Sequence, residues 1–181
     1  GKKQHFNAVQ PARLLDALRD KEERLQMVLP TLIAKAASAK QTQEVMVYYG
    51  IKGIRSALDK SLEELKGGGH YFDFGVSGLF HSMMGAYWDL WQKRKKKYRI
   101  HSQVIFNEDV KNSPELLKSY YGEARFHPAE YASLTDTIIY NDTVVLVVWT
   151  GKPPVAIVIQ NMENAESYRN QFKLMWKQAK G

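Results

Sequence analysis

Three short turns carry the groups best suited to hold a small polar molecule. They are the segments 50–53, 75–78 and 107–109, and each follows a run of residues typical of a β-strand. Glycine lets the backbone approach a ligand closely, serine offers a hydroxyl, lysine a charge, and Asn or Asp can bind sugar-type hydroxyls. Taken one at a time, these residue types are also common in turns and helix caps. The candidate ligand-binding residues are Gly50, Lys52, Gly75, Ser77, Asn107 and Asp109.

Catalytic motifs are not found in the chain. The five histidines show no HExxH or short paired spacing, and there is no cysteine to act as a nucleophile or thiolate ligand. No G-x-S-x-G elbow, GxxxxGK[ST] loop or GxGxxG fingerprint is present. We therefore expect no catalytic residue, no metal site and no cofactor.

The elements that must position the three turns alternate between strand and helix. Strands are predicted at 44–49, 70–74 and 100–106, with amphipathic helices at 51–66 and 79–95 between them. Parallel pairing of these strands is the default for this order, and it brings all three turns to one edge of a sheet.

The second half is richer in strands. A short strand is predicted at 124–126, a hairpin at 137–149 around Asn141-Asp142, a further antiparallel strand at 155–159 and a closing helix at 162–179. The fold class is therefore α/β, with a mixed sheet that is parallel in its first half, antiparallel in its second, and flanked by helices.

The residues from Pro11 to about Ala39 predict a long helix with a heptad-like apolar seam. The seam is interrupted by Lys21, and Pro30 is expected to kink or split the helix. We interpret the seam as a coiled-coil-like homodimerisation surface; packing on the chain's own domain is the alternative. The seam residues are Leu14, Leu18, Leu25, Val28 and Leu32. Residues 1–40 form a linker and dimerisation helix in this interpretation, and 41–181 the α/β domain.

Composition narrows the class of protein. The chain has 181 residues, 44% of them hydrophobic, which fits one globular domain with an appendage. It lacks the apolar run needed to cross a bilayer and the apolar core of a signal peptide, and the absence of cysteine fits a cytoplasmic location. The net charge of +7 is concentrated at Lys93–Arg99, which we interpret as a solvated helix end, with contact to nucleic acid as the alternative.

An ordered set of segments resembles a known family. Val47–Ile54, Phe74–Gly78, Val104–Asp109, Ile139–Val144 and Ala165–Arg169 together resemble the effector-sensing region of TrmB-like archaeal transcriptional regulators. The resemblance implies a fold related to the phospholipase D superfamily, used for sensing an effector such as a sugar. It also implies that DNA is bound by an upstream winged helix-turn-helix, which these residues do not include.

The catalytic pattern of active phospholipase D relatives is H-x-K-x4-D. The frame that ends at Asp142 has Thr135 in place of His and Thr137 in place of Lys, so phosphohistidine chemistry is not expected. The leading interpretation is thus a non-catalytic, homodimeric sensing domain of a transcriptional regulator. The alternatives are a phospholipase D-like phosphodiesterase that uses Asp142, Glu108 or Asp109 with a recruited metal, and a basic nucleic-acid-binding module.

Overall fold

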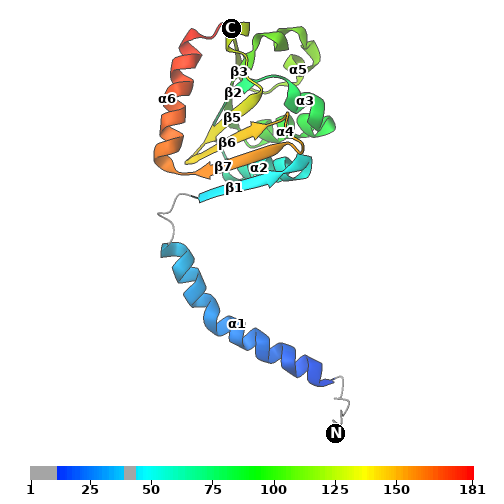
Figure 1. The fold of residues 1–181 in the computed structure, drawn as a ribbon, viewed down its shortest axis with the longest axis vertical. Helices are drawn as coiled ribbons and strands as arrows, with labels where there is room; N and C mark the ends of the chain where they lie inside the picture. The colour runs from blue at the N-terminus through cyan, green and yellow to red at the C-terminus, as the bar shows by residue number, and fades with distance from the viewer. Residues whose placement is uncertain (1–11, 39–43) are drawn as a thin grey trace, which may run out of the picture. The chain divides into compact units, whose positions relative to one another are not determined.

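The structure is a computed structural model that describes residues 12–38 and 44–181 (Figure 1). Helix α1 belongs to one compact unit, and the other described elements belong to a second unit. The helices and strands, in chain order, are α1 (Ala12–Ser38), β1 (Glu44–Tyr49), α2 (Gly50–Glu64), β2 (Gly69–Val76), α3 (Leu79–Met84), α4 (Ala86–Lys97), β3 (Ile100–Asn107), the 3-10 helix η2 (Glu108–Asn112), α5 (Pro114–Ser119), β4 (Glu123–His127), the 3-10 helix η3 (Ala129–Tyr131), β5 (Thr135–Tyr140), β6 (Thr143–Val148), β7 (Val155–Gln160) and α6 (Met162–Gln178).

The second unit is built on one mixed sheet of seven strands, in the order β1-β7-β6-β5-β2-β3-β4. Strands β2, β3 and β4 pair in parallel, whereas β2/β5, β5/β6, β6/β7 and β7/β1 pair antiparallel. The predicted α/β class with a mixed sheet is confirmed. Asn141 adopts a positive φ of 44° in the tight turn between β5 and β6, as the polar hairpin turn requires.

The predicted pairing of the first strand is wrong. We expected β1 to pair in parallel with the next strands, but it lies at the edge of the sheet and pairs only with β7. The β5–β6–β7 meander occupies the positions between β1 and β2, because its β-branched strands pair with one another through short turns. Strand β1 still runs in the direction of β2 and β3, so all three end at the same edge. Four strand spacings, about 19 Å in all, separate β1 from β2.

Helices cover both faces of the sheet (Figure 1). Helices α2, α3, α4 and α5 pack over one face, whose core contains Ile54, Trp91 and Phe106. Helix α6 packs on the other face through Ala165 and Phe172. The predicted single helix at 79–95 is two helices, because Gly85 adopts a backbone conformation (φ 52°, ψ −129°) that ends α3 and begins α4. The fold is therefore three-layered, and α4 lies on the same face as α2.

Helix α1 is continuous through Pro30, so the predicted split does not occur, although the ribbon is curved (Figure 1). A single proline removes one backbone hydrogen bond, which the turns on either side tolerate. Within residues 12–38 and 44–181, we found no helix with both the length and the apolar character that a bilayer crossing demands.

Candidate functional site

The edge at which β2 and β3 end contains four of the six predicted ligand-binding residues. Asn107 is the last residue of β3, and both the nitrogen and the oxygen of its side-chain amide bond to the chain itself. Its Nδ2 donates to the carbonyl oxygen of Ser133 at 2.6 Å, and its Oδ1 accepts from the backbone N–H of Ser133 at 3.2 Å. Asn107 therefore holds Ser133 in this structure, and its role in binding sugar hydroxyls stays a prediction.

Gly75 explains how the Ser133–Thr135 segment reaches this edge. Its φ is 78°, and β2 shifts register against β3 between Phe74 and Val76. A Cβ atom at Gly75 would lie 2.6 Å from the carbonyl oxygen of Thr135, closer than any carbon and oxygen can pack. Glycine is needed here because the segment passes directly over it, and the close approach that the sequence suggested for a ligand is made by the chain itself.

The remaining candidates fall into two places. Ser77 follows β2, and its buried Oγ has no hydrogen-bond partner, while Asp109 is exposed in η2, just after β3. Gly50 and Lys52 follow the edge strand β1, about 19 Å from β2 at the strand spacing given above. The Gly50 N–H donates to the carbonyl oxygen of Pro154 at 2.7 Å, and Lys52 is exposed. The predicted convergence of all three turns is thus corrected: they share an edge, but only the second and third are neighbours.

A buried group of charges beneath α4 was missed by the sequence reasoning. Lys95 lies within the basic block that we interpreted as a solvated helix end, yet it is 0% exposed. Its Nζ donates to Ser102 Oγ at 2.9 Å and lies 4.5 Å from the ring centres of both Trp91 and Tyr120. Burial lowers the pKa of Lys95 to about 7, against the opposing effect of Asp73. The block is solvated only in part.

Two carboxylates share this side of the sheet with Lys95. Asp73 on β2 lies opposite Ile138 on β5, and Asp136 is two residues before Ile138, so the two aspartates are diagonal neighbours on one face. Burial and then repulsion from Asp136 raise the pKa of Asp73 well above its ordinary value, against the effect of Lys95. Burial likewise raises the pKa of Asp136 to about 7, although its Oδ2 accepts from Trp149 Nε1 at 2.8 Å.

A cavity of about 10 Å³ lies between α4 and the sheet. Four polar atoms of residues on its wall are buried without a hydrogen-bond partner: Tyr71 Oη, Asp73 Oδ1, Trp91 Nε1 and Gln92 Nε2. The volume matches a single water molecule and is far below that of a sugar. In this conformation the site can hold charges and a water, but it has no room for a substrate beside the Lys95 amine.

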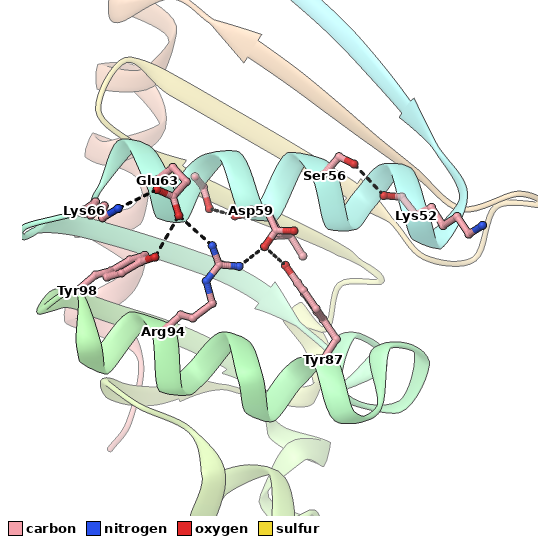
Figure 2. A network of polar contacts seen from close by, with 10 residues as sticks. Lys52, Ser56, Asp59, Glu63, Lys66, Tyr87, Arg94 and Tyr98 are labelled. Atoms are coloured by element: carbon pink, nitrogen blue, oxygen red, sulfur yellow. Dashed lines mark hydrogen bonds and ion pairs between the residues drawn. The ribbon is translucent and has the colours of Figure 1, made fainter.

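The outer side of α4 is tied to α2 by a separate polar network (Figure 2). The Arg94 guanidinium forms ion pairs with Asp59 and, at 3.1 Å, with Glu63. Tyr87 donates to Asp59 at 3.0 Å and Tyr98 donates to Glu63 at 3.1 Å. Helix α4 is therefore fixed by ion pairs on one side and by the buried Lys95 on the other.

The residues of the hydrolase frame lie along β5 and in the turn that follows it. Thr135 begins β5, Thr137 follows on the same strand, and Asp142 lies beyond its far end in the turn to β6. The Asp142 carboxylate accepts hydrogen bonds from Gln160 and Thr143, each at 3.2 Å. Among the side chains that the structure describes, no three His, Cys, Asp or Glu residues are grouped so as to hold a metal ion.

These features define a three-layered α/β domain preceded by a long helix. No protein-family model matches the sequence, and no curated protein matches it either. Solved structures that share the fold include the following two. One is TrmBL2, described as an archaeal chromatin protein with a novel mode of DNA binding; it matches with a TM-score of 0.55 and 15% identity over 99% of this chain and 75% of TrmBL2. The other is NucT from Helicobacter pylori, with a TM-score of 0.50 and 11% identity over 77% of this chain and 99% of NucT. At these identities the likeness shows the fold alone.

Proposed function

We propose that the chain is the dimer-forming, effector-sensing part of a TrmB-type transcriptional regulator, with DNA bound by an upstream winged helix-turn-helix. The observation that carries the proposal is the apolar seam of α1, whose side chains are exposed. Its five members, Leu14, Leu18, Leu25, Val28 and Leu32, are between 50% and 67% exposed. The shared fold with TrmBL2, a DNA-binding chromatin protein, extends over 99% of the chain and supports the same class.

Pairing of two copies through this seam is energetically reasonable. Full burial of a Leu or Val side chain contributes about 1.5–3 kcal/mol. The seam supplies five such side chains per copy, against an association cost of about 4–15 kcal/mol. The spacings of four, seven, three and four residues keep the seam on one stripe of the helix, with Lys21 at the position between Leu18 and Leu25.

The effector site of this proposal is the edge beside β2 and β3, around Ser77. The hydroxyl of Ser77 is buried and unpartnered, so a polar group of a ligand can satisfy it where the chain does not. The Ser133–Thr135 segment covers the neighbouring Gly75, and its displacement would enlarge the site. The effector acts only if it binds one arrangement of the dimer more tightly than the other. The proposed role is non-catalytic, because Thr135 and Thr137 supply no nucleophilic imidazole and no phosphate-binding amine.

Sedimentation of the full chain tests the dimer. We expect wild type to sediment as a dimer and Leu25→Glu as a monomer, since the new carboxylate would be buried in the seam. Met27→Glu is the matched control: Met27 lies on the same helix, off the seam, and is 72% exposed. A monomeric wild type, or equal behaviour of the two variants, would contradict the proposal.

Thermal unfolding with a panel of sugars and sugar phosphates tests the sensing role. A ligand at one hundred times its Kd stabilises the folded protein by about 2.7 kcal/mol, which raises the midpoint by several degrees. Ser77→Ala should remove that shift while leaving the dimer intact. No shift with any compound at millimolar concentration would argue against sensing and leave the dimer result standing.

A further inference from the structure

Three buried ionisable side chains lie on the α4 side of the sheet: Asp73 and Lys95 line one cavity, and Asp136 is the diagonal neighbour of Asp73 on the adjacent strand. Lys95 comes from α4, Asp73 from β2 and Asp136 from β5, and all are at most 5% exposed. Each aspartate keeps one carboxylate oxygen, Oδ1, without a hydrogen-bond partner. Buried carboxylate oxygens that lack partners are costly, so their protonation state needs an explanation.

Charge counting supplies that explanation. With both carboxylates and the lysine ionised, the group carries a net charge of −1 in the interior. A single added proton makes it neutral, and two carboxyl groups on neighbouring strands can hold one proton between them. The cavity beside Asp73 has room for one water, which can bridge Asp73 Oδ1 to the free N–H groups of Trp91 and Gln92.

We propose that Asp73 and Asp136 share one proton beside the Lys95 ammonium, so that the space beneath α4 is a buried proton-binding site whose emptying loosens that helix. The proposal does not depend on the sensing function. In this proposal the folded domain binds a proton at a site that is buried from solvent.

The other titratable groups around the cluster stay neutral. Tyr71 on β2, Tyr120 after α5 and Tyr140 on β5 face the cluster or its neighbours, and burial raises the pKa of each phenol above its ordinary value. Trp149 donates to Asp136 and does not titrate. Among the described side chains, Lys95 is the cation that lines the cavity beside Asp73. In the proposal the proton is held by the carboxyl pair.

Loss of the proton affects helix α4, because exposed ion pairs hold one side of this helix and the buried Lys95 holds the other. Arg94 on the outer side forms ion pairs with Asp59 and Glu63. On the inner side Lys95 is held by Ser102 and by the neighbouring aromatic rings. Loss of the shared proton leaves a net negative charge at this inner contact, and Gly85 separates α4 from α3 at the N-terminal end of the helix.

Carboxyl carbon NMR on the full wild-type chain tests the proposal without any mutation. We expect one or two aspartate signals to titrate above pH 6, and Lys95→Met to raise that midpoint, because the removed ammonium favours the ionised carboxylates. Lys96→Met, at an exposed position of the same helix, should leave the midpoint unchanged. Aspartate signals that all titrate below pH 5 would overturn the proposal.

Urea unfolding between pH 5 and pH 7 gives a second test. One proton held by the folded chain and not by the unfolded chain lowers the folding constant about tenfold per pH unit as pH rises. Asp136→Asn should remove that dependence from the wild-type profile, whereas Asp89→Asn, an exposed carboxylate on α4, should keep it. Parallel profiles for wild type and Asp136→Asn would refute a shared proton, and if Asp136→Asn does not fold, the NMR titration decides.

Discussion

Replacement of Gly75 by alanine should lower the free energy of unfolding for two reasons, an unfavourable backbone conformation and a steric overlap. The φ of 78° places any residue with a Cβ in the left-handed region, at about 1–2 kcal/mol. The Cβ would also lie 2.6 Å from the carbonyl oxygen of Thr135 and 3.0 Å from Ser133 Cβ. Relief of that overlap requires movement of the covering segment, at about 1–3 kcal/mol more. We therefore expect Gly75→Ala to destabilise the domain by about 2–5 kcal/mol.

Gly50 offers a matched control for this prediction. Its φ is 70°, and a Cβ there would meet no atom within 4 Å, so Gly50→Ala carries the backbone cost without the overlap. Urea denaturation of both variants gives the two free energies of unfolding, and the difference of about 1–3 kcal/mol measures the overlap alone. Equal destabilisation by the two substitutions would refute the argument that the Ser133–Thr135 segment is held against β2.

Three further predictions follow from the polar groups. Arg94→Ala should cost about 1 kcal/mol, less in high salt, because its partners on α2 are roughly half exposed; urea unfolding at two salt concentrations checks this. The pKa of Asp136 is about 7 in the folded protein and ordinary when unfolded, so the folded chain binds an extra proton between about pH 4 and pH 7. The stability that this proton contributes is lost as pH rises through that window. Calorimetric unfolding in buffers of different ionisation heat measures the proton released on unfolding. A phosphodiester substrate should not be hydrolysed, and turnover that disappears in Asp142→Asn would revive the enzyme alternative.

The strands were predictable from the sequence, but their neighbours were not. Alternating and β-branched runs at 44–49 and 137–149 identify strands wherever they pair. Strand β1 can pair with β2 or with β7 at the edge of the sheet, and the choice depends on which pairing buries more apolar surface over the whole sheet. The local sequence pattern does not contain that quantity. The short segments η2 and α5, between Glu108 and Ser119, also escaped prediction, because one or two turns of helix have no measurable periodicity.

The buried cluster did leave a signal in the sequence. Tyr87, Trp88, Trp91 and Lys95 recur at helical spacing, which places Lys95 on the apolar stripe of α4. Its cationic neighbours in the chain concealed this, since a run of basic residues is usually read as a solvated surface. In β2, strict alternation similarly places Asp73 on the same face as the buried Tyr71. Whether a charged residue is buried is thus indicated better by its place on an apolar stripe than by the number of charged residues next to it in the sequence.

The edge and the buried cluster are parts of one stretch of sheet. Asp73 precedes Gly75 by two residues on β2, and Asp136 directly follows Thr135, whose carbonyl oxygen lies over Gly75. Displacement of the Ser133–Thr135 segment by a ligand at the edge therefore moves the backbone that carries Asp136. Linkage between two sites is reciprocal, so under the two proposals together an effector that moves this segment would change how tightly the carboxyl pair holds its proton, and the proton would change the effector's affinity by the same factor. Strand β2, which ends at the proposed sensing edge, and strand β5, which begins beside it, thus connect that edge to the α4 side of the sheet.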